Sequence, residues 1–159
     1  MPNGYSRGMS SGVKQMEREC LALQTAMTAR AIARVYATTM RPLGVGPTQF
    51  HLLGTLTLYP DFGMSELSEM LVIDRSTLVR NLKLLERDGL IESNRPAGSR
   101  TKRFAVTDAG HALIATAEPL WQAAHRQLVA ALGPDGLDDA RGALERLRIA
   151  AREVAPADG

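Results

Sequence analysis

The most regular alternation of apolar and polar residues lies at 74–89, DRSTLVRNLKLLERDG. Its apolar positions recur at spacings of four and three residues, which predicts an amphipathic helix with a leucine face formed by Leu78, Leu82 and Leu85. Asp74 is suited to cap this helix because its short carboxylate can accept from the free N–H groups of the first turn. Gly89 is suited to the left-handed residue just beyond a helix end. The opposite face carries hydroxyl and cationic side chains: Ser76, Arg80, Lys83 and Arg87.

Three helices are predicted before this one. Residues 13–40 hold no Gly or Pro and are rich in good helix formers, so they predict one long helix. Thr48 is expected to cap a second helix over 49–59, and Ser65 a third, short helix over 65–71. Only two residues then separate the short helix from the amphipathic one, which indicates a tight turn between them.

A β-hairpin is predicted after the amphipathic helix. Residues 90–95 and 100–106 have the composition of strands, and the PAGS segment between them has that of a turn. The hairpin carries four cations, namely Arg95, Arg100, Lys102 and Arg103.

Two long helices are predicted at the C-terminal end. Thr107 or Asp108 is expected to cap the first, which ends near Leu132 before Gly133 and Pro134. The last helix covers about 135–154. Its apolar positions have the spacing of a face that packs against another helix: Leu137, Leu144, Leu147, Ala151 and Val154.

The order of these elements indicates a helix-turn-helix motif followed by a wing. In that motif the second helix reads DNA, and a basic hairpin beside it can insert Arg into a narrow minor groove. The turn lacks the glycine often found in such motifs. The alternative is a solvated surface helix and a plain hairpin with solubilising charges. We expect double-stranded DNA as a partner, with candidate contacts Ser65, Asp74, Arg75, Ser76, Thr77, Arg80, Asn81, Lys83, Arg95, Arg100, Lys102 and Arg103.

The predicted fold is mostly α with a small β-hairpin wing (α+β). The first and last helices extend beyond a compact winged domain, so we expect them to pair with the same helices of a second chain in a homodimer. The expected organisation is a disordered tail at 1–12, a helical dimerisation region at 13–47 and 108–155, and a winged helix-turn-helix domain at 48–107.

Charge is distributed unevenly along the 159 residues. Residues 74–103 hold 8 Lys or Arg against 4 Asp or Glu, although the whole chain has a formal net charge of only +2. This favours an anionic partner at the predicted DNA-binding region alone. Cys20 is the only cysteine, which fits a reducing, cytoplasmic setting, and no apolar run approaches the length of a membrane span.

The chain resembles the MarR family (multiple antibiotic resistance regulators) from about residue 20 to 133. The resemblance is densest in MSELSEMLVIDRSTLVRNLKLLERDGLIESNRP and in FAVTDAGHALI with the following PLW. It implies a homodimeric winged helix-turn-helix repressor that a small ligand or an oxidant releases from DNA. Asp74 to Lys83 match the recognition helix of that family, with Ser76, Thr77 and Arg80 as groove readers.

The wing departs from the family's Asp-Arg-Arg signature. Arg100 matches its second arginine, but Gly98 stands at the Asp position and Ser99 at the first Arg position. The resemblance implies that the Asp steadies a wing arginine by a charged hydrogen bond. Lys102 and Arg103 are therefore expected to share the work of Arg100.

Two kinds of sensing stay open. The resemblance implies a ligand cavity between the dimer helices and the winged domain, with candidate residues Met27, Arg34, Tyr36, His51 and Trp121. Arg34 or His51 could then donate a hydrogen bond to an anionic phenolic effector. The alternative is an oxidant-sensing repressor that uses Cys20, but a buried, inert cysteine is the commoner case.

Other classes of protein have little support. The His and Cys residues show no metal-binding spacing, and no cofactor is expected. The sequence lacks a phosphate-binding glycine loop, a nucleophile elbow and paired carboxylates, which disfavours an enzyme. An architectural module without sequence-specific binding is the third class. Base-contact candidates such as Arg80 and Ser76 argue against it.

Overall fold

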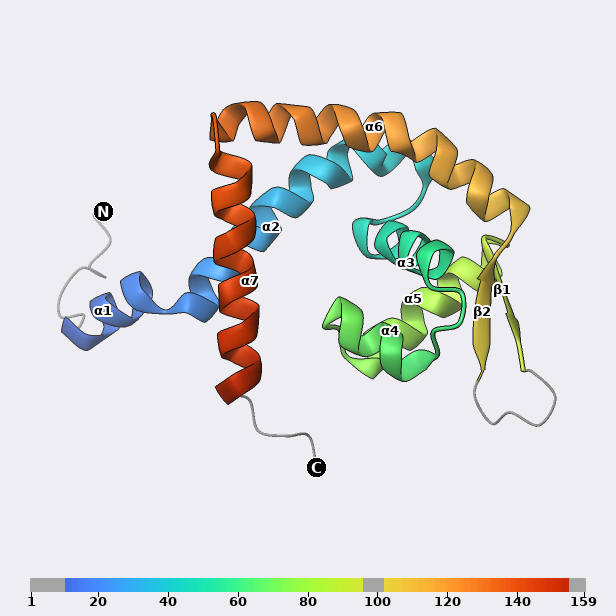
Figure 1. The fold of residues 1–159 in the computed structure, drawn as a ribbon, viewed down its shortest axis with the longest axis horizontal. Helices are drawn as coiled ribbons and strands as arrows, with labels where there is room; N and C mark the ends of the chain where they lie inside the picture. The colour runs from blue at the N-terminus through green and yellow to red at the C-terminus, as the bar shows by residue number, and fades with distance from the viewer. Residues whose placement is uncertain (1–10, 96–101, 155–159) are drawn as a thin grey trace, which may run out of the picture.

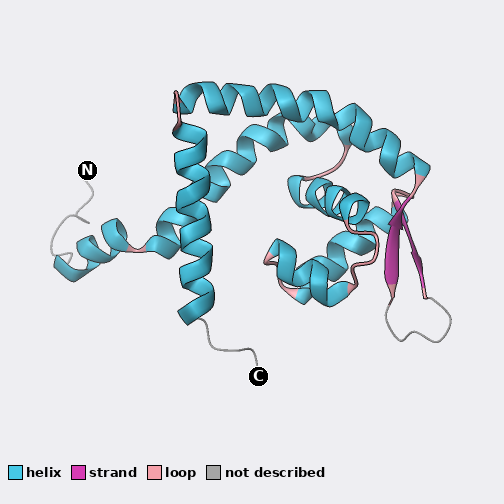
Figure 2. Ribbon diagram, in the orientation of Figure 1, coloured by secondary structure: helices cyan, strands magenta, loops and turns pink. Residues whose placement is uncertain are grey.

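A computed structural model describes residues 11–95 and 102–154 of the chain. Within these residues the fold is almost entirely helical, with one two-stranded antiparallel sheet (Figures 1 and 2). This confirms the predicted mostly α fold with a β-hairpin. The elements are α1 (Ser11–Glu19), α2 (Leu21–Met40), the 3-10 helix η1 (Arg41–Leu43), α3 (Pro47–Leu58), α4 (Met64–Leu71), α5 (Arg75–Arg87), β1 (Ile91–Asn94), β2 (Arg103–Val106), α6 (Asp108–Leu132) and α7 (Gly136–Val154). The predicted tail, up to residue 10, and Gly98, Ser99 and Arg100 lie outside the described residues.

The hydrophobic core lies in the winged-helix part, where α3, α4, α5 and the hairpin pack together at one end of the molecule (Figure 1). Its fully buried side chains are Leu52, Leu53, Leu56, Leu67, Leu78, Leu85 and Ile91. The leucine face predicted for the amphipathic helix is therefore the face that α5 buries. The opposite stripe of α5, formed by Ser76, Arg80, Lys83 and Arg87, faces outward.

Local signals at both ends of α5 act as predicted. Asp74 is the N-cap, and its Oδ1 accepts from the backbone N–H of Thr77 at 2.7 Å. Gly89 has a φ of +70°, the left-handed conformation that ends the helix. The turn before α5 also needs a left-handed residue, and Val72 takes that conformation with a φ of 50° in place of a glycine.

Two predicted N-caps are wrong by about two residues. α3 begins at Pro47 after Gly46, not after Thr48, because the Gln49 side chain accepts from the backbone N–H of Gly46 at 2.9 Å. α4 begins at Met64 after Gly63, not after Ser65, because Glu66 accepts from the backbone N–H of Gly63 at 3.1 Å. In both cases a side chain in the first turn reaches back to the glycine and fixes the start.

The predicted single helix over 13–40 is wrong, since the chain is extended at Cys20 with a ψ of 102°. This break separates α1 from α2 and leaves carbonyl groups at the end of α1 without helical partners. The Gln24 side chain donates to one of them, the Glu17 carbonyl, at 3.2 Å.

α6 is the long connection across the molecule. Its N-cap is Thr107, whose hydroxyl accepts from the backbone N–H of Gly110 at 3.1 Å. The helix runs over α3 and along α2 (Figure 1). α7 then turns back and crosses α2 in the view of Figure 1, and none of its described residues is buried. No described helix combines the length and apolar character needed to cross a membrane.

Candidate nucleic-acid interface and internal cavity

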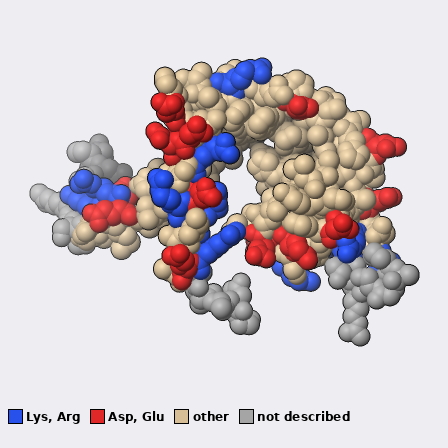
Figure 3. Space-filling view, viewed as in Figure 1, with Lys and Arg blue, Asp and Glu red and all other residues tan. Residues whose placement is uncertain are grey.

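The outward stripe of α5 consists of exposed polar side chains. Arg75, Ser76, Arg80 and Lys83 are all exposed, and Thr77 is half-buried. Ser65 is also exposed, in the first turn of α4. The face shown in Figure 3 carries both signs of charge, with basic side chains at the lower edge of the winged-helix part. Such a stripe can donate to phosphates and to the edges of bases.

Asp74 directs its charge toward the start of α5. The Ser76 hydroxyl donates to its Oδ1 at 2.5 Å, and Thr77 donates from its backbone N–H. Hydrogen bonds from Ser76 first and then from Thr77 hold the pKa of Asp74 well below its usual value. The carboxylate is therefore ionised at neutral pH and is occupied within the first turn, where it stabilises the helix that carries Arg80.

Asn81 lies on the inner side of α5 and is only 9% exposed. Its side-chain amide donates to the carbonyl of Thr77 at 2.8 Å. The structure therefore groups Asn81 with the buried face of the helix, apart from the exposed stripe in which the sequence analysis included it.

The base of the wing is fixed to the rest of the domain by two of its own cations. Lys102 Nζ lies 3.4 Å from Glu86 of α5 and 5.2 Å from the centre of the Phe104 ring. Arg103 Nη1 donates to the Asp61 carboxylate at 2.7 Å and to the Asp61 carbonyl at 2.8 Å. Arg95 is exposed at the end of β1, and Arg100 lies outside the described residues.

Glu86 connects α5 to strand β1 and to Lys102, the residue that precedes β2. It accepts from the Ser93 hydroxyl on β1 and pairs with Lys102 just before β2. The Ser93 hydrogen bond, followed by the charge and hydrogen bond of Lys102, lowers the pKa of Glu86. Glu86 and Asp61 therefore steady this wing from outside it. Sequence reasoning missed both, because each lies many residues away from its partner.

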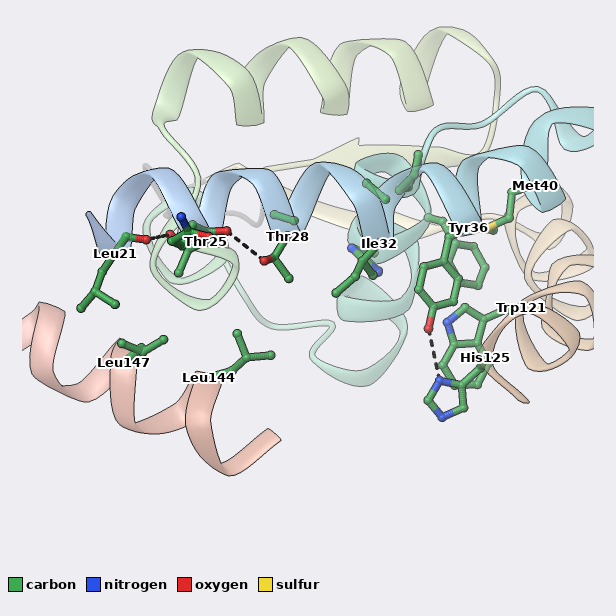
Figure 4. A pocket seen from close by; sticks show the side chains of 16 residues that line it. Leu21, Thr25, Thr28, Ile32, Tyr36, Met40, Trp121, His125, Leu144 and Leu147 are labelled. Atoms are coloured by element: carbon green, nitrogen blue, oxygen red, sulfur yellow. Dashed lines mark hydrogen bonds between the residues drawn. The ribbon is translucent and has the colours of Figure 1, made fainter. Parts of the chain in front are cut away.

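A separate cavity of about 770 Å³ lies among α2, α3, α6 and α7. Its apolar wall includes Leu21, Ile32, Met40, Phe50, Leu144 and Leu147. Its polar groups are Gln24, Thr25, Thr28, Tyr36, His51 and His125. Figure 4 shows two ends along α2, an aliphatic end near Leu21 and an aromatic end at Tyr36.

The aromatic end is built by stacked rings. Tyr36 Oη lies 3.2 Å from His125 Nδ1, within hydrogen-bond distance (Figure 4). The Trp121 and His125 rings stack with centroids 4.8 Å apart and planes 9° apart. Tyr36 lies nearly parallel to Trp121, with ring centroids 6.5 Å apart. Burial lowers the pKa of His51, which lines the same cavity.

The structure brings three of the five predicted ligand residues to this cavity, namely Tyr36, His51 and Trp121. Met27 and Arg34 are not among the residues that line it, and both are exposed on other faces of α2. His125 was missed, although it follows Trp121 by one helical turn and so shares its face of α6.

Cys20 is half-buried at the break between α1 and α2 and does not line the cavity. Tyr36, sixteen residues after Cys20, has His125 as its hydrogen-bond partner. Among the described residues, no group of three or more His, Cys, Asp or Glu side chains could hold a metal ion.

Comparison with known proteins identifies relatives of this chain. A family model described as the MarR family matches residues 43–100. The transcriptional regulator MosR of M. tuberculosis, solved in complex with DNA, is 33% identical with a TM-score of 0.78, over 87% of this chain and 100% of that one. The transcriptional repressor CouR, bound to a 23-mer DNA duplex, is 26% identical with a TM-score of 0.75, over 84% of this chain and 95% of that one.

A mutant form of E. coli MarR, complexed with operator DNA, shares the fold. Its TM-score is 0.74 and its identity 23%, over 83% of this chain and 96% of that one. No curated protein sequence matches the chain.

Proposed function

Because the chain belongs to the MarR family of DNA-binding transcriptional regulators, we propose that it is a repressor that binds a pseudo-palindromic operator as a homodimer. A small ligand in the cavity, with a phenol as one candidate, then releases it from DNA. The observation that carries this proposal is the exposed stripe of Arg75, Ser76, Arg80 and Lys83 on a helix whose opposite face is buried.

The apolar surface of the terminal helices supports the homodimer. Large apolar side chains are exposed along α1, α2 and α7: Val13, Met16, Leu21, Leu23, Met27, Val35, Leu144, Ile149 and Val154. Exposed apolar area of this extent favours burial against a partner. A two-fold pair places two recognition helices about one DNA turn apart, so half-sites should be about 10 base pairs apart. On this basis 13–47 and 108–155 dimerise and 48–107 bind DNA.

Substitution of Arg80 tests the DNA contacts. Arg80→Ala should relax base preference and cost about 1–3 kcal/mol if the guanidinium is bidentate to a guanine. Arg100→Ala should instead weaken binding evenly across sequences and flatten the salt dependence by about one unit for each phosphate that is no longer bound. Arg126→Ala, an exposed arginine on α6, is the matched control and should bind like the parent.

Fluorescence anisotropy with operator and scrambled duplexes, over a series of salt concentrations, measures these effects. Parent-like binding by both Arg80→Ala and Arg100→Ala would refute the assignment of these residues. Sedimentation of the free protein tests the dimer, and a monomer that does not bind duplex DNA at low ionic strength would refute the whole proposal.

The cavity is favoured over Cys20 as the sensing site. Cys20 lies outside the cavity lining, and Tyr36 is hydrogen-bonded to His125 and not to the thiol. Alkylation of Cys20 should therefore leave operator affinity unchanged. A large loss of affinity on alkylation would favour the oxidant-sensing alternative.

A further inference from the structure

We propose that the effector of this chain is an uncharged, planar aromatic molecule that binds at the aromatic end of the cavity. This inference rests on the proposed release of DNA by a ligand in the cavity and specifies the chemistry of that ligand. An uncharged effector differs from the anionic phenolic effector expected from the sequence. Of the two residues expected to bind the anion, Arg34 does not line the cavity and His51 does.

The first argument is the absence of fixed charge. Among the described residues that line the cavity there is no Lys, Arg, Asp or Glu. Arg34, the cation expected there, is exposed on another face of α2. A carboxylate buried in such surroundings loses its hydration and gains no ion pair, which strongly disfavours binding of an anion.

His51 does not replace the missing cation. Burial lowers the pKa of His51, so this ring is neutral at neutral pH and can offer a hydrogen bond but no charge. The Nδ1 of His125 already lies within hydrogen-bond distance of the Tyr36 hydroxyl.

The second argument is the geometry of the rings. Trp121 and His125 are stacked with nearly parallel planes, and Tyr36 is nearly parallel to Trp121. Together with Ile32 and Met40 these side chains border a space with flat aromatic and aliphatic walls (Figure 4). A planar ring can stack there, and one polar atom of the ligand can hydrogen-bond to the Tyr36 hydroxyl or to His51.

The chain contains its own probe of this site. Trp121 is the only tryptophan, and it lines the cavity, so intrinsic fluorescence reports occupation of the aromatic end. We would titrate the full-length protein at neutral pH with matched pairs that differ in charge, namely naphthamide against naphthoate and cinnamamide against cinnamate. Release of operator DNA is measured separately by anisotropy, and free tryptophan corrects for absorption by the probes.

The neutral member of each pair should quench Trp121 at concentrations at least about tenfold lower than the anion does, a difference equivalent to about 1.4 kcal/mol in binding free energy. The neutral member should also release operator DNA at lower concentrations than the anion does. Equal or tighter binding of the anions would overturn this inference while leaving ligand-induced release intact. If neither the neutral molecule nor the anion quenches Trp121, the inference about the effector is also overturned. Binding of operator DNA in the absence of ligand then still tests the proposed function on its own.

A matched pair of variants supplies an independent check. Thr28 and Thr38 both lie on α2, are exposed, and donate to the carbonyl four residues earlier, but only Thr28 lines the cavity. Thr28→Lys should shift the preference toward naphthoate, and Thr38→Lys should keep the preference of the parent. Two results would count against the inference. One is a Thr28→Lys variant that keeps the parent's preference for the neutral probe, and the other is the same shift toward the anion in both variants.

Discussion

Replacement of Gly110 by alanine should disrupt the junction between the DNA-binding part and α6. Gly110 is buried in the first turn of α6, and an added Cβ would lie 2.2 Å from the Leu90 carbonyl oxygen and 2.6 Å from Val106 Cγ1. The Leu90 carbonyl cannot move freely, because it also accepts from the backbone N–H of Thr107 at 3.1 Å. The backbone must therefore shift to admit a single methyl group.

The magnitude follows from three contributions. Overpacking costs about 1–3 kcal/mol, and a contact this short places the cost at or above the top of that range. Weakening of the hydrogen bond to the Leu90 carbonyl costs about 1 kcal/mol. The higher helix propensity of alanine returns about 1 kcal/mol. The net loss of about 2–4 kcal/mol in the free energy of unfolding lowers the melting temperature by about 5–15 °C in a chain of this length.

Gly54→Ala is the matched control, because Gly54 lies inside α3 and an added Cβ there meets nothing within 4 Å. That variant should be more stable than the parent by about 0.5–1 kcal/mol. Urea unfolding followed by circular dichroism measures both variants. If Gly110→Ala unfolds within about 1 kcal/mol of the parent, the contact between α6 and Leu90 is not as tight as this reasoning requires.

Three further predictions concern the recognition helix and its surroundings. Val72→Gly should stabilise the protein by about 1 kcal/mol in urea unfolding, since Val72 has a left-handed backbone conformation and the residue is 69% exposed. A loss of stability would contradict this. Glu86→Gln should tighten DNA binding and steepen its salt dependence by about one unit, because Lys102 is freed for phosphate, whereas Glu145→Gln on α7 should change neither. Because the pKa of Asp74 is depressed, its ionised form stabilises the fold above its usual pKa of 3.8, and this contribution is lost as the pH falls toward the lower folded-state pKa. The parent should therefore lose stability more steeply than Asp74→Ala between about pH 4 and pH 2, and equal slopes would contradict the cap.

The sequence predicts α5 well because its signals are local. The leucine spacing, the cap at Asp74 and the stop at Gly89 all lie within or beside the helix they define. The errors at Thr48 and Ser65 are also local, because threonine and serine are preferred N-cap residues and each lies only two residues after the glycine that is the N-cap. The reach of Gln49 and Glu66 back to Gly46 and Gly63 decides the start instead.

Helical periodicity explains why one of the expected ligand residues on α2 does not reach the cavity. At about 100° per residue, Met27 lies about 180° around α2 from Tyr36, so the two cannot face one cavity. The residues of α2 that do line the cavity include Leu21, Thr25, Thr28, Ile32 and Tyr36, at spacings of three and four. This face was readable from the sequence, but nothing in the sequence shows which face of α2 meets α6.

The wing contacts could not be predicted, because they depend on tertiary structure. Lys102 and Glu86 are 16 residues apart, and Arg103 and Asp61 are 42 apart. The sequence shows only that the wing lacks its own acid at Gly98. The fold supplies the acids from α5 and from the loop before α4, which explains how a hairpin with this departure keeps a fixed base.

The cavity and the recognition helix share α6 as their common element. Trp121 and His125 line the cavity from its middle, while its first turn is fixed to the end of α5. There the Thr107 hydroxyl donates to the Gly89 carbonyl at 2.7 Å, and its backbone N–H donates to the Leu90 carbonyl. A ligand that displaces α6 must therefore either move the end of α5 and the start of β1 with it or break these two hydrogen bonds. Because Gly110 leaves no space between α6 and Leu90, movement as one unit is the less costly response, and we expect occupation of the cavity to reorient the DNA-reading face.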